Sequence, residues 1–278
     1  MSLIMNDIKY FITVSETFNI TRASEIIGIS QPALSYAVKR LENELGGELI
    51  IRLKNGVQLT KLGEEFKQRS RRLLYEWEQA QNLANPESGF IQGSYTIAVH
   101  PSVALYILGC FMPKLQLDFP KLDFNFIHGL SREMTEKVIS WRADFGLVVN
   151  PIKHPDLVIN RLCSDEVTIF YVENAPDKLI YDPNLAQSQY ILKKIGKKDY
   201  FNNMLNSANL EVAAKLTSLG LGYGILPTRV ASQYNHLKKL KDAPVFRDEI
   251  CLVYRPEKHK NPVSKKIIQI IKSSVSIR

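Results

Sequence analysis

The stretch ISQPALSYAVKRLENELGG, residues 29–47, decides the first half of the fold. Its apolar residues recur at the spacing of one helix face, which predicts a helix over residues 31–45 that ends at a Gly-Gly pair. Ser30 or Gln31 can accept hydrogen bonds from the first free backbone amides, and Pro32 is tolerated in the first turn. The stripe that we expect in the core consists of Leu34, Ala37, Val38, Leu41 and Leu45.

The segment before this helix supplies the rest of a helix-turn-helix. A short helix is predicted over residues 21–27, with Thr21 as its cap and Gly28 as its stop. Residues 28–30 form a tight turn between the two helices. A third helix over residues 6–17 presents an apolar face that buries the pair. Motifs of this kind insert their second helix into the major groove of DNA.

The polar face of the helix over residues 31–45 fits that role. An ordinary solvated face is rich in Glu and Lys, whereas this one carries hydroxyls and an aromatic ring in front and cations behind. The first turns of a recognition helix meet base edges, and adjacent cations meet phosphates. The predicted base-reading residues are Ser30, Gln31, Pro32, Ser35 and Tyr36, the predicted phosphate contacts are Lys39 and Arg40, and Thr21 completes the set.

A basic hairpin is predicted after the recognition helix. Residues 49–51 and 57–59 have the pattern of short strands, and the turn over residues 52–56 ends in Asn-Gly, a strong hairpin signal. A wing beside a recognition helix places Arg52 and Lys54 near phosphates or in a minor groove. The alternative is an ordinary charged turn in water.

Residues 18–66 resemble the LysR-type transcriptional regulators. The shared residues are Ala23, the run Ser30-Gln31-Pro32-Ala33-Leu34-Ser35, Leu41-Glu42, Leu45-Gly46, Arg52 and Leu59-Thr60-Lys61-Leu62-Gly63. Ser24 stands where the family has a second alanine and Ile50 where it has Phe, and both are conservative packing changes. Tyr36 often corresponds to a more polar or basic residue, which leaves the preferred DNA sequence open.

A long helix is predicted from Thr60 to about residue 84. Its apolar residues, spaced by three, four or seven, are Phe66, Leu73, Trp77, Ala80 and Ala84. This spacing fits a seam between two helices, either within one chain or between two. The family resemblance implies that the helix pairs two subunits, so a homodimer is expected, with a tetramer open by analogy. Residues 85–89 (NPESG) break the helix and mark a domain boundary.

Strands and helices alternate beyond this boundary, which predicts an α/β domain with largely parallel strands. In the first part, strands are predicted over residues 94–99, 122–127 and 145–149, and helices over 103–118 and 132–140. A strand over 166–173 leads to a second lobe, in which 179–181, 223–226 and 250–254 suggest another small sheet beside a helix over 210–219. The last helix, residues 263–273, is expected to pack on the first lobe.

Two such lobes resemble the effector-binding half of LysR-type regulators, which is itself similar to periplasmic solute-binding proteins. The matching marks are residues 93–98 (GSYTIA), 115–120, 143–147 (ADFGL) and 220–227 (GLGYGILP), although the second lobe looks short. The expected fold is a multidomain α+β architecture. Its parts are a winged helix-turn-helix (1–60), a linker and dimerisation helix with hinge (61–89), and a two-lobed effector-binding domain (90–278), with lobe I about 90–173 and 255–278 and lobe II about 174–254.

Polar residues follow the predicted strands at the ends where open α/β sheets bind ligands. The expected effector-contacting residues are His100, Ser102, His128, Ser131, Arg132, Asn150, Ser207 and Ile225. Ser102 and Ser131 are predicted to donate hydrogen bonds to a polar or anionic group of a small metabolite, and Arg132 is a candidate anion contact. Simple helix capping is the alternative for both serines.

No catalytic motif stands out. The run GLGYG over residues 220–224 follows a helix and precedes a strand, the reverse of the order that aims backbone amides at a phosphate. Cys110, Cys163 and Cys251 lie far apart without a CxxC pair, so free thiols are expected rather than a metal site or a peroxide sensor. We therefore expect no enzymatic activity, no metal and no cofactor.

The distribution of charge and the length of the apolar runs limit where a DNA site can lie and where the protein is located. The net charge is +8, but residues 1–85 carry eleven Lys or Arg against ten Asp or Glu, so bulk charge does not locate a DNA site. The longest apolar run, residues 103–112, is too short to span a bilayer, and the amino terminus lacks a signal-peptide pattern. A cytoplasmic location without membrane contact is expected.

The sequence as a whole predicts a homodimeric LysR-type transcriptional regulator. Its winged helix-turn-helix would bind double-stranded promoter DNA, and its two-lobed domain would sense a small molecule for which an anionic group is one option. A two-lobed solute-binding protein without a DNA role is the alternative, disfavoured because it needs a signal peptide and has no use for residues 1–85. An enzyme ranks third.

Overall fold

The computed structural model describes residues 3–83, 93–195, 201 and 203–275. Two compact units arise, one mainly from residues 1–93 and the other mainly from residues 94–278. The expected hinge over residues 85–89 and the last residue of the predicted linker stripe, Ala84, lie outside the described residues.

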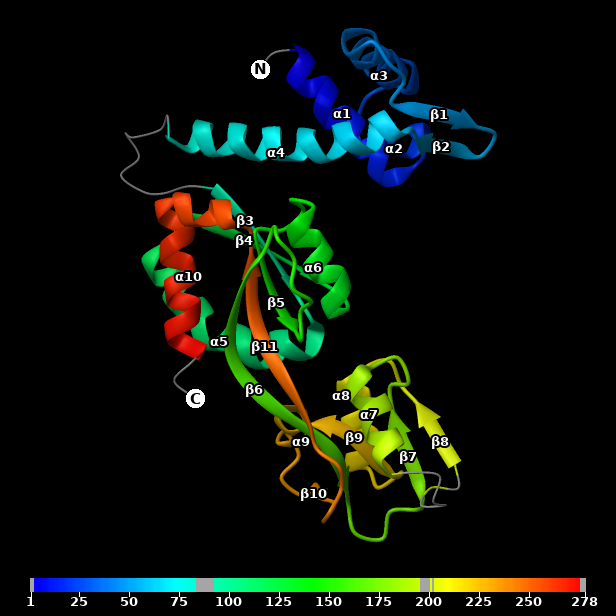
Figure 1. Ribbon diagram of the computed structural model, residues 1–278, viewed down its shortest axis with the longest axis vertical. Helices are drawn as coiled ribbons and strands as arrows, with labels where there is room; N and C mark the ends of the chain where they lie inside the picture. The colour runs from blue at the N-terminus through cyan, green and yellow to red at the C-terminus, as the bar shows by residue number, and fades with distance from the viewer. Residues whose placement is uncertain (1–2, 84–92, 196–200, 202, 276–278) are drawn as a thin grey trace. The chain divides into compact units, whose positions relative to one another are not determined.

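The first unit is a winged helix-turn-helix followed by a long helix (Figure 1). Its elements are α1 (Leu3–Thr17), α2 (Ile20–Ile27), α3 (Gln31–Leu45), β1 (Ile50–Leu53), β2 (Gly56–Leu59) and α4 (Lys61–Leu83). Ser30 caps α3 by accepting from the Ala33 amide (3.3 Å), and Thr60 accepts from the Gly63 amide at the start of α4 (2.9 Å). These two helices, α3 and α4, therefore begin where the capping signals placed them.

Two local expectations for this unit were wrong. Asn19, not Thr21, caps α2, because its side chain accepts from the Arg22 amide (3.0 Å) and the helix begins one residue earlier. Leu45 is exposed although it continues the apolar stripe of α3. The core that α1, α2 and the wing form with α3 includes Leu41 but not Leu45, so the apolar spacing continues for one turn beyond the packed part of the helix.

The second unit is built on one mixed sheet with the strand order β4-β3-β5-β11-β6-β9-β7-β8 and with β10 beside β6. The strands are β3 (Gly93–Val99), β4 (Leu122–His128), β5 (Phe145–Val149), β6 (Val158–Tyr171), β7 (Lys178–Tyr181), β8 (Asn203–Asn206), β9 (Tyr223–Pro227), β10 (Lys238–Lys239) and β11 (Phe246–Tyr254). The helices are α5 (Pro101–Asp118), α6 (Ser131–Ile139), α7 (Ala186–Ile195), α8 (Leu210–Ser218), α9 (Thr228–Ala231), the 3₁₀ helix η2 (Pro256–Lys260) and α10 (Pro262–Val275).

Two long antiparallel strands, β6 and β11, run from one lobe of this unit into the other (Figure 1). In the first lobe, residues 250–254 of β11 pair with residues 145–149 of β5. In the second lobe, residues 167–170 of β6 pair with β9. The assignment of residues 250–254 to a separate second sheet was therefore wrong, and β6 begins eight residues earlier than expected. Strand patterns alone do not say which sheet a strand joins.

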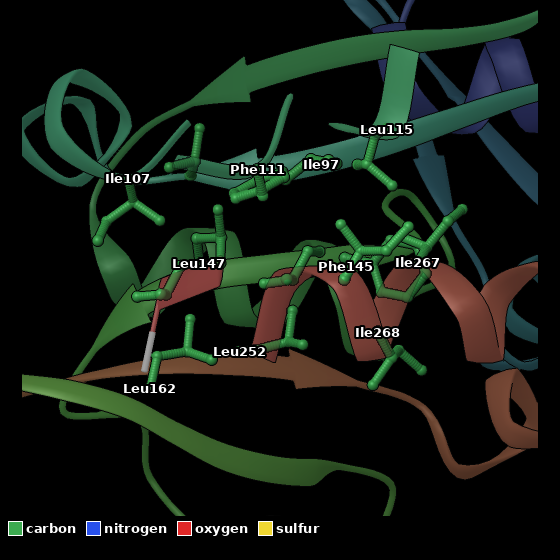
Figure 2. Packing of buried hydrophobic residues seen from close by; sticks show 14 of the residues in the cluster. Ile97, Ile107, Phe111, Leu115, Phe145, Leu147, Leu162, Leu252, Ile267 and Ile268 are labelled. Atoms are coloured by element: carbon green, nitrogen blue, oxygen red, sulfur yellow. The ribbon is translucent and has the colours of Figure 1, made fainter. Parts of the chain in front are cut away.

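Buried apolar side chains cover both faces of the sheet in the first lobe. On one face, Ile97, Phe145 and Leu252 meet side chains of α5 and α10 (Figure 2). On the other face, Val148 and Val253 meet α6. Burial on both faces explains why these strands read as nearly continuous apolar runs. No helix within the described ranges is long and apolar enough to cross a membrane.

Candidate DNA interface and effector pocket

The recognition helix α3 presents a separate polar face to solvent. Ser30, Gln31, Pro32 and Lys39 are exposed, and Tyr36 has 66% of its surface accessible. The core side of the helix is formed by Leu34, Ala37, Val38 and Leu41. The structure thus places most of the predicted base-reading residues together on one open surface of the first two turns.

Ser35 and Arg40 depart from the expected arrangement. The Ser35 hydroxyl is buried and has no hydrogen-bond partner among the described residues, so it is not presented at the surface as predicted. The Arg40 guanidinium donates two hydrogen bonds to the buried Asp7 carboxylate of α1, from Nε at 2.7 Å and from an Nη at 2.6 Å. These hydrogen bonds raise the pKa of Arg40. Arg40 is therefore committed to the fold rather than free for a phosphate.

The wing carries its two predicted cations on an exposed turn. β1 and β2 pair antiparallel, with Leu53 opposite Gly56, and Arg52 and Lys54 are exposed. Gly56 adopts φ 145°, and a Cβ there would lie 2.5 Å from the Phe18 carbonyl oxygen. Only glycine fits this approach of the wing to the turn between α1 and α2.

Glu42 attaches the wing to the recognition helix. This nearly buried carboxylate accepts hydrogen bonds from the backbone amides of Leu49 (2.9 Å) and Ile50 (3.3 Å). Its other oxygen lies 3.6 Å from the Lys39 ammonium. The position of the wing beside α3 therefore depends on a side chain that the sequence analysis treated only as part of a motif.

A cavity of about 500 Å³ lies between the lobes of the second unit, against the strands β6 and β11 that join them. Five of the eight predicted effector contacts line it: His100, Ser102, Ser131, Arg132 and Asn150. His128, the last residue of β4, and Ser207, which follows β8, do not line it. Ile225 packs into the core of the second lobe instead, and Pro227 lines the cavity.

Both serines in the cavity wall are already engaged. The Ser102 hydroxyl donates to the Glu211 carboxylate (3.3 Å), and the Ser131 oxygen accepts from the Val149 amide (3.0 Å). In this structure the Ser102 hydroxyl proton is therefore directed at Glu211, and donation to an anion stays a prediction. The Ser131 hydroxyl proton is still available for a ligand, because this oxygen acts as the acceptor.

Two acidic residues in the cavity wall escaped the sequence analysis. Asp165 of β6 and Asp248 of β11 are paired in register and both line the cavity. Burial raises the pKa of Asp248 to about 6, against a hydrogen bond from Asn150 (2.7 Å), and burial also raises the pKa of Asp165. The available signal was an Asp-Glu pair inside each of the two strands, Asp165-Glu166 in β6 and Asp248-Glu249 in β11.

His100 and Arg132 differ in charge and exposure. Burial lowers the pKa of His100, and its Nδ1 has no hydrogen-bond partner within the described part of the chain. Arg132 is exposed and makes no ion pair with any described residue. The cavity therefore combines a largely apolar wall with a neutral imidazole, a free guanidinium and two carboxyl groups.

Potential metal ligands and cysteines are the remaining candidates among the side chains that the structure describes. Within them, no group of three or more His, Cys, Asp or Glu residues is arranged to hold a metal ion. The three cysteines are free, and burial raises the pKa of Cys251 to about 11. A thiol with a raised pKa is a poor nucleophile at neutral pH.

Two family models match the chain. Residues 5–64 match the model described as a bacterial regulatory helix-turn-helix protein of the lysR family, and residues 88–176 match the LysR substrate binding domain. Together these matches span more than half of the sequence. The chain belongs to the LysR family. This LysR protein is a DNA-binding transcriptional regulator with an effector-binding domain, which favours the regulator over a solute-binding protein without a DNA role.

Individual relatives agree with this assignment. The chain is 28% identical over 215 residues to the HTH-type transcriptional regulator CysL of Bacillus subtilis (strain 168), covering 76% of this chain and 72% of that protein. Full-length LysG from Corynebacterium glutamicum with bound effector Arg has the same fold, with a TM-score of 0.67 and 13% identity. The match covers 99% of this chain and 98% of LysG. Full-length CbnR complexed with its target DNA also has this fold, with a TM-score of 0.51 and 20% identity; the match covers 99% of this chain and 100% of CbnR.

Proposed function

We propose that the exposed face of α3 and the wing form the DNA-binding surface of this LysR protein. Gln31, Pro32 and Tyr36 are assigned to base edges, with Ser30 and Thr21 beside them, and Lys39, Arg52 and Lys54 to phosphates. The observation that carries this assignment is the accessible polar face of the first two turns of α3, opposite a fully buried apolar face. The CbnR complex with its target DNA supports it by analogy of fold.

The experiment that tests this surface is selection of an operator from a random duplex library, followed by fluorescence anisotropy at fixed salt against random competitor. Gln31→Ala should lower affinity for the selected site roughly 5- to 150-fold, because a bidentate base contact contributes roughly 1–3 kcal/mol of discrimination. Asn43→Ala, an exposed change in the last turn of the same helix, serves as the matched control. Failure to select any sequence would reject the proposal.

We further propose that the protein acts as a homodimer joined through α4, with tetramers as a higher assembly. In the single chain, Leu73 and Trp77 of α4 are 48% and 39% exposed. A long helix with large apolar side chains on one accessible stripe gains stability by burying that stripe against a second copy.

The cavity between the lobes is proposed as the effector site, for a small molecule with an apolar body and an anionic group facing Arg132. Its volume suits a metabolite, and its position on the two strands that join the lobes lets a ligand favour one lobe arrangement over another. The LysG structure with bound Arg supports an effector of metabolite size.

Thermal unfolding of the full chain with a panel of small organic carboxylates tests this site. A carboxylate that raises the melting temperature of the wild type should lose its effect in Arg132→Gln and keep it in Lys265→Gln, an exposed change on α10. No cofactor and no catalytic activity are proposed, and the proposed place of action is the cytoplasm, where bacterial promoter DNA lies.

A further inference from the structure

Arg40 is held in one orientation by the interior of the DNA-binding unit. Asp7 is 1% exposed, and its two carboxylate oxygens accept the paired hydrogen bonds from Arg40 at 2.7 and 2.6 Å. A two-point contact between a planar guanidinium and a carboxylate fixes the plane of the guanidinium as well as its position. Arg40 therefore presents a rigid, flat cation at the surface of α3.

The Tyr36 ring lies against that cation. Tyr36 and Arg40 are four residues apart on α3 and so lie on the same face, with the guanidinium carbon 5.2 Å from the ring centroid. Tyr36 is 66% exposed, and among the described residues its ring makes no other cation–π or aromatic contact. The side-chain direction of Tyr36 therefore depends on Arg40, and the direction of Arg40 depends on Asp7.

Arg40 is a poor candidate for a phosphate contact for the same reason. To reach DNA it would have to leave Asp7, and a buried carboxylate that loses its partner is strongly destabilising. Its neighbour Lys39 is held less tightly: its side chain is 58% exposed, and its ion pair with Glu42, at 3.6 Å, is longer than a hydrogen bond. The two adjacent cations thus have different environments and should act differently on DNA.

We propose that Arg40 is a positioning residue for sequence recognition: the Asp7–Arg40 pair orients the Tyr36 ring toward the bases, and Lys39 makes the phosphate contact. This inference rests on the proposed DNA-binding surface of α3. It predicts that specificity, not salt-dependent affinity, changes when the pair is altered.

The experiment uses the full chain, the operator selected by the wild type and every single-base variant of that operator. Affinity is measured by anisotropy over a range of NaCl concentrations. A phosphate contact contributes about 0.9 to the slope of log affinity against log salt, so Lys39→Gln, which removes one contact from each subunit of the dimer, should lower the slope by about 1.8 with base preferences unchanged. In Asp7→Asn/Arg40→Gln, a neutral pair of similar shape, the slope should stay at the wild-type value.

Specificity gives the second readout. The double variant should lose roughly three- to tenfold discrimination at the base pairs whose preference also disappears in Tyr36→Ala, and adding Tyr36→Ala to it should cause no further loss there. Arg40→Lys keeps the charge against Asp7 but loses the planar fork, so it should show the same loss of discrimination. If the neutral pair does not fold, Arg40→Lys alone decides the question.

Three results would overturn the inference. One is a slope in the neutral-pair variant that falls as in Lys39→Gln, which would make Arg40 a phosphate contact. Another is unchanged base preference in Arg40→Lys. The third is full additivity with Tyr36→Ala. A wild-type protein that selects no operator would instead reject the proposed DNA-binding surface and the inference with it.

Discussion

Asp165 and Asp248 lie directly opposite each other on β6 and β11, at the strands that join the two lobes. Like charges at directly paired positions are destabilising, and both carboxyl groups are largely buried. Burial raises the pKa of Asp248 to about 6, with a smaller contribution from the Asp165 charge, and burial also raises the pKa of Asp165, so the folded protein disfavours the charged form of both groups. These residues therefore oppose stability at neutral pH, a pattern typical of groups kept for a ligand.

Asp248→Asn should stabilise the protein at pH 8 but not at low pH. The folded-state pKa of about 6 lies above the ordinary value of 3.8, so the folded state binds a proton more tightly between these values. The contribution of Asp248 to the unfolding free energy thus falls as pH rises from about 4 to 7. Removing the charge should gain up to about 3 kcal/mol at pH 8 and almost nothing below about pH 4.

Urea unfolding at a series of pH values measures this difference. Asp123→Asn makes the same charge change on an exposed residue of β4 and should leave the pH profile unchanged. Equal stabilisation of Asp248→Asn at pH 4 and pH 8 would contradict the assignment of the proton to this carboxyl group.

Among the elements, the wing depends on α3 through one side chain. Glu42→Ala removes the acceptor for the amides of Leu49 and Ile50, and buried donors without partners cost about 1–3 kcal/mol each. We expect the unfolding free energy of the first unit to fall by about 2–4 kcal/mol. Hydrogen exchange of peptides that cover residues 48–51 should accelerate, whereas the exposed change Glu44→Ala should leave it unaltered.

The α4 helix carries the prediction for assembly. Trp77→Lys places a charge on the exposed apolar stripe and should shift the protein from dimer to monomer at micromolar concentration, because a buried charge without a partner opposes association. Trp77→Phe keeps an apolar ring and should remain dimeric. Sedimentation velocity distinguishes the two, and a dimeric Trp77→Lys protein would mean that another surface joins the subunits.

Element positions were predictable where the signals are local, and sheet order was not. The caps Ser30 and Thr60 and the helix spacing located α3 and α4 from sequence. The order of strands in the sheet depends on contacts between distant residues, which periodicity does not encode. For this reason His128 and Ser207 were wrongly placed in the cavity, and Asp165 and Asp248 were missed although neighbouring strands bring them together.

At the scale of the whole molecule, coupling between effector and DNA has to be reciprocal. If a bound effector changes operator affinity by some factor, operator must change effector affinity by the same factor. The strands β6 and β11 pass through both lobes and line the cavity, so a ligand there can favour one lobe arrangement. The α4 helix, through which we propose that the dimer forms, then determines whether one or two recognition helices bind the operator at the same time.

The salt dependence of binding reports that number. Each phosphate contact contributes about 0.9 to the slope of log affinity against log salt, so two DNA-binding units acting together should show about twice the slope of one. Trp77→Lys should therefore bind the selected operator with about half the wild-type slope, measured by anisotropy between low and moderate NaCl, while Trp77→Phe keeps the full slope. Because the substitution lies on α4, away from α3 and the wing, base preference within one half-site should be unchanged. A monomeric variant with the full slope would mean that a single unit makes every phosphate contact.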